Sequence, residues 1–587
     1  MDMMKKVPVR EQDPKVRATN FEEVCLGYNE EEARAEASRC LKCKNPKCVG
    51  GCPVSIDIPG FIKEVQEGNY EEAAKVIAKS SALPAVCGRV CNRRCEDACT
   101  RGSIDQAIAI DEVKKFIAQQ DLDAETRYIP KKVVPSLNGS FSERVAIIGA
   151  GPAGLSCAFY LAEKGYSPVI FEKNEKPGGM LRYGIPSFKL EKDVIDAEID
   201  IIKAMGVEIK CGIEVGKDVT LDELRAQGYK AFYIAIGCQG GRKAGIPGED
   251  AEGVMTAVDF LRTVGADESY PVTGKAVVVG GGNVAIDVAR TAQRCGAESV
   301  AMFCLEPRDK MPASEEEIAE ALEEDVTIDC GWGPKEILTE NGRVTGIVFK
   351  RCVSVWDKDG KFAPAYDEND TKTVPCDRVF LSIGQSILWG DLLKGSKVEL
   401  GRGNGAVADS LTYQTAEPDI FVGGDVYTGP KFAIDAIAAG REGAISIHRF
   451  VQPHSSLTIG RNRREFIALD KDNIKVEQYD NASRQIPGTR KDVDHKKSFR
   501  DAKLPFTEEQ VKAETARCLG CGASVVDPNK CIGCGVCTTK CEFGAIKLHR
   551  ERPECSNMIP SEKKLPYVLG NGAKQALKIK FSKKKEQ

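Results

Sequence analysis

Two copies of one pattern restrict the fold of this chain more than any other feature. Each copy reads as a strand, a glycine-rich turn, a helix and a second strand. The first is RVAIIGAGPAGLSCAFYLAEKGYSPVIFEK, in which Gly149, Gly151 and Gly154 follow the strand, with Pro152 and Ala153 in the same turn. The first glycine permits a tight turn, the second lets the backbone approach a pyrophosphate, and the third lets helix and strand pack closely. The segment therefore predicts a dinucleotide-binding unit, with the phosphates at the helix N-terminus.

Two further segments also predict dinucleotide binding: the second strand of this copy, and the whole second copy. VIFEK places Glu172, followed by Lys173, where a carboxylate would accept hydrogen bonds from a ribose. The second copy begins KAVVVGGGNVAIDVARTAQRCGAESVAMFC. Its fingerprint residues are Gly280, Gly282, Asn283 and Ala285.

Two dinucleotide folds in one chain, the second inserted in the first, are the architecture of flavin–nicotinamide oxidoreductases. The segment DIFVGGDVYTG supports this, because Gly424 and Asp425 stand as the Gly-Asp pair that approaches the flavin in such enzymes. The triplet AIG, ending at Gly237, and SIGQ at 382–385 resemble the turns that link the two folds. We expect FAD in the first fold and a nicotinamide nucleotide in the second.

Cysteines gather at both ends of the chain. Of 24, eight lie within Cys40–Cys99 and six within Cys518–Cys541. A reducing cytosol does not favour disulfides, so the clustering indicates metal ligation. Thiolates suit [4Fe–4S] clusters or zinc, and a neighbouring flavin favours clusters because zinc has no redox chemistry. The predicted metal ligands are Cys40, Cys43, Cys48, Cys52, Cys91, Cys95, Cys99, Cys518, Cys521, Cys531, Cys534, Cys537 and Cys541. Cys87 is left out of this set because of what the family resemblance described below implies.

The C-terminal cysteines form the ferredoxin run C-x2-C-x2-C-x3-C, with Glu542 where Pro is usual. In two-cluster ferredoxins the fourth Cys of such a run serves the other cluster. With Cys555 the module has seven thiols, so we expect one cluster, or two with a non-Cys ligand or a rearranged scheme. An internal repeat, 20–43 and 498–521, ends in Arg-Cys-Leu-x-x-Cys in both copies. Other isolated cysteines are expected to be small buried residues.

Three motifs carry a resemblance to a known family. PGGMLRYGIPSFKL (177–190), GGGNVAIDVARTA (280–292) and MPA (311–313) resemble the small subunit of glutamate synthase. They are also similar to the large subunit of the electron-bifurcating NADH-dependent ferredoxin:NADP oxidoreductase and to the N-terminal part of dihydropyrimidine dehydrogenase. The resemblance spans about residues 15–450. It implies an FAD site lined by Gly179, Met180, Leu181 and Arg182.

The resemblance also implies how the N-terminal cysteines are shared. Cys40, Cys43, Cys48 and Cys99 would hold one [4Fe–4S] cluster, and Cys52, Cys91 and Cys95 would begin a second. Where some relatives supply a Gln or Glu as the last ligand, this chain has Lys114, a poor ligand. Cys87 and Glu112 are the two candidates to replace it.

The nucleotide preference depends on the strand after the second fingerprint. In NADPH-using relatives this strand ends in Tyr-Arg-Arg, whose arginines hold the 2′-phosphate. This chain has Cys304, Leu305 and Glu306 there. A carboxylate would repel a phosphate and suit a free 2′-hydroxyl, which favours NAD(H) over NADP(H). Arg308 lies nearby in sequence, and the alternative is that Glu306 points to solvent.

The predicted fold is a multidomain α/β protein with an N-terminal helical iron–sulfur domain, two nested Rossmann-like domains and a C-terminal ferredoxin-like module. The boundaries expected are 1–140 for the helical domain with two [4Fe–4S] sites, 141–255 and 375–450 for FAD, 256–374 for NAD(P), 451–507 for a linker, and 508–587 for the module and tail. A net charge of −4, no signal peptide and no apolar run of about 18 residues predict a cytoplasmic protein without nucleic-acid partners or a membrane span.

The function expected is that of an electron-transfer subunit. It would exchange hydride between NAD(P)(H) and FAD and pass single electrons through clusters to other redox subunits or ferredoxin, as in an electron-bifurcating transhydrogenase. No acid–base or nucleophilic residue is required, so no catalytic residue is named. The alternatives are a glutamate synthase small subunit, a flavin disulfide reductase, and a scaffold protein stabilised by zinc. A flavin disulfide reductase needs a cysteine pair near the flavin, but no CxxC occurs within 145–450.

Overall fold

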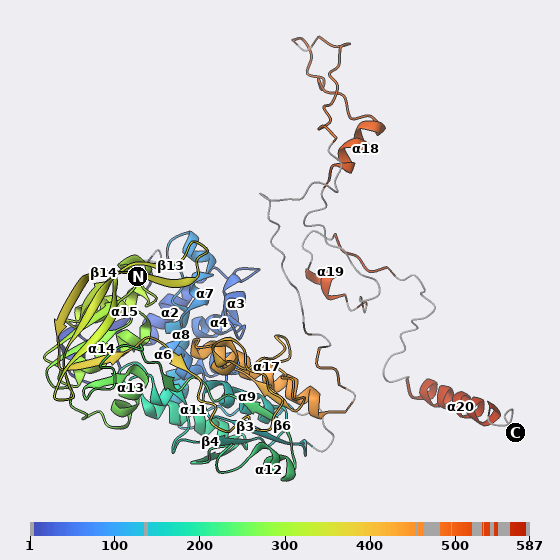
Figure 1. Cartoon of the computed structure of the whole chain (residues 1–587). Coiled ribbons are helices and arrows are strands. Elements are labelled where there is room, and N and C mark those ends of the chain that lie inside the picture. The colour runs from blue at the N-terminus through green and yellow to red at the C-terminus, as the bar shows by residue number, and fades with distance from the viewer. Residues whose placement is uncertain are drawn as a thin grey trace. The chain divides into compact units, whose positions relative to one another are not determined.

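The chain divides into two units, Met1–Arg463 and Arg464–Gln587. The computed structural model describes residues 5–133, 139–453, 455–458, 461, 482–494, 496–518, 531, 533, 535–540, 545–549 and 564–582. Figure 1 shows the helices and strands and labels many of them with the names used below.

Short helices and the connections that carry the cysteines form the N-terminal part of the first unit. Their ends follow local sequence. The helix α4 begins after Asp57, whose side chain accepts a hydrogen bond from the Gly60 N–H, and it ends at Gly68 with φ of 82°. Asp at an N-cap and Gly in the left-handed region are favoured at these positions. The elements are β1 (Arg10–Glu11), α1 (Pro14–Arg17), β2 (Cys25–Gly27), α2 (Glu30–Ser38), α3 (Lys47–Gly51), α4 (Ile58–Glu67), α5 (Tyr70–Ala78), α6 (Pro84–Val90), α7 (Arg94–Asp97), η1 (Thr100–Ser103) and α8 (Ile110–Leu122).

A five-stranded parallel sheet in the order β17-β6-β3-β4-β5 forms the first Rossmann-like fold. Helices α9 and α17 lie side by side on it (Figure 1). They approach so closely that a Cβ added at Gly440 would lie 2.3 Å from the Ala153 carbonyl oxygen. The elements are β3 (Arg144–Ile148), α9 (Pro152–Glu163), β4 (Val169–Glu172), α10 (Met180–Tyr183), α11 (Lys192–Ala204), β5 (Glu208–Cys211), α12 (Leu221–Ala226), β6 (Tyr229–Ile234), β17 (Ile420–Val422), α16 (Asp425–Thr428) and α17 (Ala433–Val451).

The chain leaves this sheet after β6, builds a second parallel sheet, and returns at β17. The second sheet has the order β11-β10-β9-β15-β8, and all its pairs are parallel. The nested pair of Rossmann-like folds predicted from the sequence is confirmed. The elements are β8 (Val254–Thr256), α13 (Ala257–Ala266), β9 (Lys275–Val279), α14 (Asn283–Arg294), β10 (Ser299–Cys304), η2 (Arg308–Lys310), α15 (Glu315–Glu323), β11 (Thr327–Cys330) and β15 (Arg378–Leu381).

Three antiparallel strands in the order β12-β13-β14 lie between β11 and β15 in sequence. One face of this sheet contributes to a buried apolar cluster that includes Ile347, Phe349 and, from β9, Val279. The remaining elements are β12 (Trp332–Glu340), β13 (Arg343–Trp356), β14 (Phe362–Pro375), the paired β7 (Gly240–Gly241) and β16 (Gln385–Ser386), and η3 (Arg402–Asn404).

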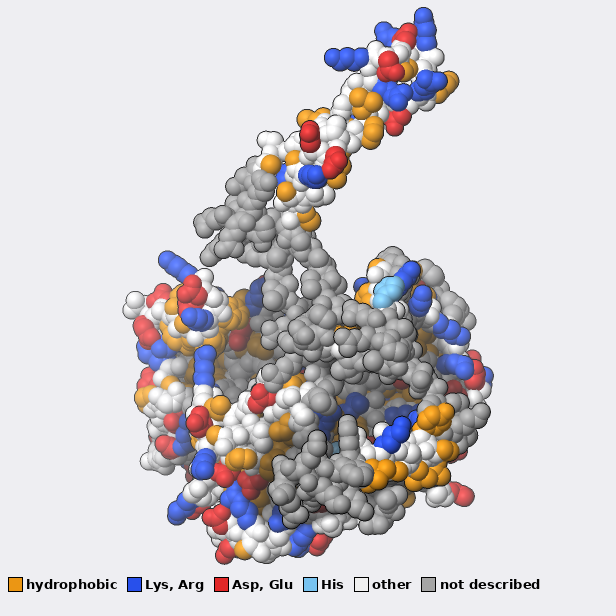
Figure 2. Space-filling view, turned by 90° about the vertical axis from the view of Figure 1, so that its right-hand side faces the viewer, with side chains coloured by type: hydrophobic (Ala, Val, Ile, Leu, Met, Phe, Trp, Pro, Cys, Tyr) orange, Lys and Arg blue, Asp and Glu red, His pale blue; other side chains and the backbone are white. Residues whose placement is uncertain are grey.

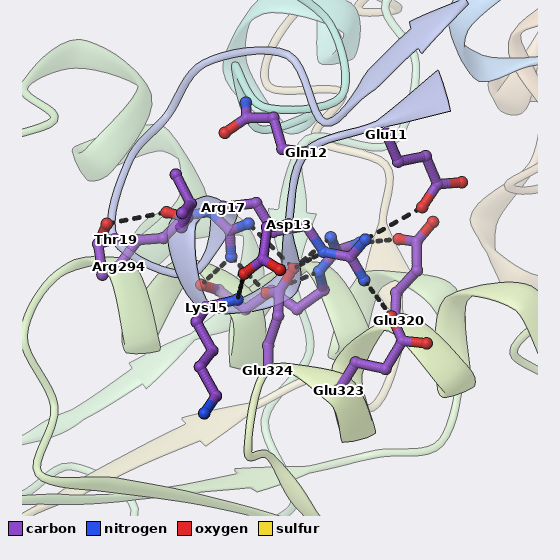
Figure 3. Close-up of polar contacts among 12 residues, drawn as sticks. Glu11, Gln12, Asp13, Lys15, Arg17, Thr19, Arg294, Glu320, Glu323 and Glu324 are labelled. Atoms are coloured by element: carbon purple, nitrogen blue, oxygen red, sulfur yellow. Dashed lines mark hydrogen bonds and ion pairs between the residues drawn. The ribbon is translucent and has the colours of Figure 1, made fainter. Parts of the chain in front are cut away.

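The N-terminal segment is tied to the second Rossmann-like fold by buried ion pairs. Arg17 of α1 donates to Glu324 at 3.0 Å and to Glu323 at 2.7 Å (Figure 3). Arg294 of α14 donates to the same Glu324 carboxylate at 2.6 Å, as does Arg290. Segments about 300 residues apart in sequence are therefore held by one carboxylate.

The second unit contains α18 (Glu508–Ala516), α19 (Val536–Lys540) and α20 (Lys564–Ser582). No helix in the described ranges is long and apolar enough to cross a membrane. On the face of the molecule drawn in Figure 2, Lys and Arg side chains intermingle with those of Asp and Glu.

Candidate functional site

One cavity of about 880 Å³ brings both glycine-rich turns together. Its wall includes Gly151 from the first fingerprint, Gly282 from the second, and Cys91 from the N-terminal cysteine groups. A volume near the upper end of the range for small-molecule sites suits extended dinucleotides. The other predicted residues on the wall are Gly149, Pro152, Ala153, Glu172, Gly179, Met180, Leu181, Gly237, Asn283, Gly424 and Asp425.

The first fingerprint has the geometry that its sequence predicts. Gly149 has φ of 104°, and a Cβ there would lie 2.5 Å from the Ala235 carbonyl oxygen. A Cβ at Gly154 would lie 2.0 Å from the Gly149 carbonyl oxygen, so this glycine serves the packing of helix on strand. At Gly151 an added Cβ would meet only the Gly179 Cα, at 3.9 Å. Gly151 is therefore the glycine that keeps space open for a ligand at the start of α9.

A second backbone segment closes over this turn. Gly179 has φ of 54°, and a Cβ there would lie 2.8 Å from the Gly151 Cα. Met180 and Leu181 continue along the wall, but Arg182 does not. The Arg182 guanidinium is buried, donates to the Pro177 carbonyl at 2.7 Å and pairs with Asp196. Its position supports the loop from outside the cavity.

Two carboxylates border the part of the cavity formed by the first sheet. Glu172 is buried at the end of β4 and accepts hydrogen bonds from the Ala150 N–H at 2.8 Å and the Asn174 N–H at 2.9 Å. These bonds fix the carboxylate where the sequence predicts a ribose contact. Burial raises the pKa of Asp425 to about 6, and its carboxylate accepts from the Lys431 N–H at 3.2 Å. Lys173, next to Glu172, is exposed.

The second fingerprint forms a similar turn. Gly280 has φ of 145°, and a Cβ there would lie 2.3 Å from the Ser382 carbonyl oxygen. Ala285 is fully buried, where the fingerprint of the first fold has its third glycine. Asn283 accepts a hydrogen bond from the Ser314 N–H at 2.9 Å. Gly280 and Ala285 thus shape the turn without lining the cavity.

Glu306 lies beside this turn. Its Oε2 is 3.0 Å from the position that a Cβ on Gly281 would take. Arg308 donates to both oxygens of Glu315, at 2.9 and 2.8 Å. The structure therefore brings the carboxylate to the fingerprint loop and pairs the nearby guanidinium with another carboxylate. Glu306 itself is outside the set that lines the cavity.

Close contact between α3 and α7 brings the cysteine groups together. A Cβ at Gly51 would lie 2.9 Å from both the Arg94 carbonyl oxygen and the Ala98 Cβ. Glycine at this point lets the two short helices touch. This contact brings Cys48 in α3 and Cys52 just after it toward Cys95 in α7 and Cys99 just after that helix.

The first four thiols share one environment. Burial raises the pKa of the Cys48 thiol to about 11, and the neighbouring Cys99 and Cys40 thiols act in the same direction. Burial, with Cys43 and Cys99, raises the pKa of Cys40. These influences show that the four thiols are near one another, and that they share one cluster stays a prediction. Cys52 likewise acts on the pKa of Cys91, and Cys91 on that of Cys95, and the assignment of this second group to a second cluster also stays a prediction.

Within the described residues, no three Cys, His, Asp or Glu side chains lie close enough to share one metal ion. A cubane takes one thiolate at each of its irons, so its ligands surround a larger core than a single ion does. The donor sets of both N-terminal groups consist of thiols, which fit such clusters. In the C-terminal module Cys518 and Cys531 are exposed and Cys537 is half-buried. The predicted ligands Cys521, Cys534 and Cys541, with Cys555, lie outside the described residues.

Sequence reasoning missed one pair of cysteines. Cys304 ends β10 and Cys330 ends β11, and their sulfur atoms lie 3.7 Å apart because the parallel register pairs them. Neither lines the cavity, so the pair does not supply the cysteines beside the flavin that a disulfide reductase needs. Among the isolated cysteines expected to be buried, the expectation is wrong for the half-buried Cys211, Cys295, Cys330 and Cys352, and right for Cys157, Cys238 and Cys376.

A charged cluster on the cavity wall was also missed. Lys189, which follows α10, pairs with Asp287 of α14 at 2.5 Å and with Glu317 of α15 at 2.9 Å. The three residues line the cavity and join the two Rossmann-like folds. Nothing in the local sequence reveals a contact between residues so far apart along the chain.

Three protein-family models match the chain. Residues 17–126 match dihydropyrimidine dehydrogenase domain II, 4Fe-4S cluster, and residues 143–440 match pyridine nucleotide-disulphide oxidoreductase. Residues 524–547 match the 4Fe-4S binding domain. These matches confirm a flavin and nicotinamide nucleotide oxidoreductase with iron–sulfur domains at both ends.

Curated relatives support the same conclusion. The NADP(+)-dependent formate dehydrogenase subunit beta of Moorella thermoacetica is 34% identical over 502 residues, 81% of this chain and 70% of the relative. The glutamate synthase [NADPH] small chain of Escherichia coli K12 is 35% identical over 458 residues, 75% of this chain and 95% of the relative. The NAD-dependent dihydropyrimidine dehydrogenase subunit PreT of Escherichia coli K12 is 36% identical over 420 residues, 71% of this chain and 94% of the relative.

Among solved structures, FprA from Mycobacterium tuberculosis (His57Gln mutant) is 19% identical to this chain with a TM-score of 0.46. The match covers 52% of this chain and 84% of FprA. The resemblance to the glutamate synthase small subunit predicted from the sequence is confirmed by the curated relatives.

Proposed function

Because the chain belongs to the pyridine nucleotide-disulphide oxidoreductase family, among the iron–sulfur flavoproteins that include glutamate synthase small chains, we propose that it exchanges hydride between NAD(H) and FAD and passes electrons singly through its clusters to partner subunits. Partner subunits are proposed because relatives are themselves named as subunits of formate dehydrogenase and dihydropyrimidine dehydrogenase.

One observation carries this proposal. A single cavity is lined by Gly151 of the FAD fingerprint, Gly282 of the nicotinamide fingerprint and Cys91 of the second cysteine group. The sites for the nicotinamide nucleotide, the flavin and the nearest cluster would thus all border one cavity. When bound, FAD accepts electron pairs and releases them singly, which links nicotinamide chemistry to one-electron clusters.

The chain's own residues would position these groups. Gly151 and Gly179 open the backbone for the pyrophosphate, and the α9 N-terminus offers its free N–H groups to the phosphates. Glu172, fixed by two backbone N–H groups, would accept hydrogen bonds from the ribose. Lys189 and its two carboxylates would hold the nucleotide fold against the flavin fold and keep water from this edge of the cavity.

The experiment is anaerobic reduction of the purified protein by NADH. Visible absorbance should show flavin and iron–sulfur bands that bleach together, and electron paramagnetic resonance should show reduced clusters. Iron, sulfide, zinc and flavin are counted in the same sample. Material that is colourless, or that contains zinc without flavin, would overturn the proposal.

The preference for NAD(H) rests on the residues beside the second fingerprint. Glu306 would repel a 2′-phosphate there, and Arg308 is paired with Glu315 rather than left to hold it. Steady-state rates with NADH and NADPH test this. A clear preference for NADPH would contradict the role given to Glu306.

A second candidate function is supply of electrons to a glutamate-forming large subunit. It is favoured by the match to nearly the whole glutamate synthase small chain, 95% of that relative. Anaerobic affinity purification from the native organism distinguishes the two. Recovery of a glutamate synthase large subunit supports this second candidate, whereas recovery of dehydrogenase or ferredoxin-type subunits supports the first.

A further inference from the structure

Lys114 lies where a last ligand of the second cluster is missing. Its side chain is buried and paired with Asp111, one turn earlier in α8. Helix α8 packs closely on α6, which contains Cys87 and ends beside Cys91. The buried ammonium therefore lies on the helix that packs against these thiols' helix. A charged ammonium has no lone pair, so it cannot be a ligand.

Cys87 is the additional thiol in this group. It lies in α6, four residues before Cys91, and residues at this spacing share a helix face. Its exposed fraction is 1%, and the Ser81 hydroxyl approaches its sulfur at 3.9 Å. Most buried cysteines are simply small apolar residues. Cys87 differs because its helix ends beside Cys91 and packs against α8, which carries the buried Lys114–Asp111 ion pair.

Close packing of α6 on α8 produces this arrangement. A Cβ added at Gly88 would lie 2.8 Å from the Lys115 Cα, so the two helix backbones meet next to Cys87 and Lys114. A larger residue at position 88 would separate them. The glycine thus brings the Cys87 thiol to the second cysteine group.

Glu112, the other candidate ligand, points elsewhere. Its carboxylate oxygens lie 3.7 and 3.9 Å from the Cys25 sulfur, and it lines the large cavity. The charges that act on it after burial are those of Asp111, Lys115, Arg93 and Glu96. Its carboxylate contacts the Cys25 thiol, which belongs to neither N-terminal cysteine group.

We propose that the second N-terminal cluster is a [4Fe–4S] cubane held by four thiolates, from Cys52, Cys87, Cys91 and Cys95, with Lys114 as a buried cation beside it. The inference rests on the proposed function, since it assumes that clusters are present. The two features compensate each other: a cation replaces the expected ligand, and a thiol one helix turn from Cys91 supplies the bond that the cation cannot make. Because net charge near a cluster sets its potential, Lys114 favours the reduced, more negative state.

The test compares Cys87→Ala with Cys157→Ala, a matched change at a fully buried cysteine of α9. Iron, sulfide and flavin are counted per chain, and spectra are recorded by electron paramagnetic resonance. Cys87→Ala should lose about four irons per chain, or convert one cluster to a three-iron form, and keep its flavin. Cys157→Ala should keep the wild-type iron content.

Two further variants cover the case in which Cys87→Ala does not fold. Lys114→Leu leaves every thiol in place and adds no ligand atom, so it should retain all iron and show a lower midpoint potential for one cluster in a redox titration. Glu112→Ala removes the other candidate ligand and should keep the wild-type iron content. Full iron with unchanged spectra in Cys87→Ala, loss of a cluster in Glu112→Ala, or an unchanged potential in Lys114→Leu overturns the inference. Wild-type protein without iron would instead overturn the proposed function.

Discussion

Glu324 has a fully buried carboxylate that contacts Arg17, Arg290 and Arg294 (Figure 3). Removing one partner of a buried ion pair leaves the others uncompensated and typically costs about 3–5 kcal/mol. We expect Glu324→Gln to lower the free energy of unfolding by this amount in urea titrations. The matched control is Glu323→Gln, whose half-exposed carboxylate contacts the same Arg17 and should cost under about 1 kcal/mol. Equal costs would contradict the role of burial.

The same residue predicts a pH dependence. Although burial acts to raise it, hydrogen bonds from Arg294 and Arg290 lower the pKa of Glu324 from 4.5 to about 2. A folded-state pKa below the unfolded value stabilises the protein above pH 4.5, and this contribution is lost as pH falls toward 2. The difference in unfolding free energy between wild type and Glu324→Gln should shrink by about 1.4 kcal/mol per pH unit in that window. A difference that stays constant from pH 7 to 3 would contradict it.

Gly151 and Gly154 have different roles: the first leaves space for a ligand, and the second lets helix and strand pack. A methyl group there meets only the Gly179 Cα at 3.9 Å, whereas at Gly154 it would collide with the Gly149 carbonyl at 2.0 Å. Gly151→Ala should therefore keep the fold and lose most bound flavin, measured as flavin per chain beside the melting temperature. Gly154→Ala should lower the melting temperature itself. If Gly151→Ala retained its full flavin content, the proposed role of Gly151 in the flavin site would be contradicted.

At the scale of elements, we predict that the turn from β10 to α15 controls the preference for NADH over NADPH. Glu315, the first residue of α15, holds Arg308 through two hydrogen bonds. Glu315→Gln should weaken this hold and free the guanidinium for a 2′-phosphate, raising kcat/KM for NADPH roughly tenfold, since a charge-assisted bond is worth about 1.5–3 kcal/mol. Glu306→Gln should act in the same direction by removing repulsion. Glu298→Gln, which changes an exposed carboxylate outside the cavity lining, is the control. Unchanged NADPH rates in both Glu315→Gln and Glu306→Gln would contradict the assignment.

At the scale of the whole molecule, the first unit has a buried apolar core of its own. The four buried apolar clusters formed by the described residues lie between Val7 and Ile447, within the first unit. A chain ending at Arg463 should therefore keep its flavin, both N-terminal clusters and NADH oxidation by ferricyanide. Transfer to a protein partner should fall at least about tenfold if the C-terminal module carries electrons outward. Loss of flavin on truncation would show that the first unit depends on the second.

Local sequence was sufficient for much of the site. The fingerprint glycines were predictable because a positive φ or a close backbone contact excludes a Cβ wherever the segment occurs. The Lys189 cluster and the Cys304–Cys330 pair were not, because each depends on which strand or helix lies next to another. Arg182 illustrates the same limit: Gly179, Met180 and Leu181 line the cavity, but the direction of the Arg182 side chain depends on Asp196, which belongs to α11.

The internal repeat shows most clearly which features follow from local sequence and which follow from tertiary structure. Helices α2 and α18 have the same length and the same capping box, from Asn29 in one and Thr507 in the other. Each also ends with an ion pair between residues three apart, Arg39–Glu36 and Arg517–Glu514, both at 2.6 Å. The sequence alone determined these features, because caps and pairs one turn apart require only neighbours along the chain.

Tertiary structure determined how deeply each copy of the repeat is buried. The exposed fractions of Arg39 and Glu36 are 1% and 0%, whereas those of Arg517 and Glu514 are 32% and 30%. The Glu36 carboxylate also accepts from the Val7 and Ala109 N–H groups, which come from distant segments. Burial depends on surfaces supplied by the rest of the fold, and no stretch of sequence specifies those surfaces by itself.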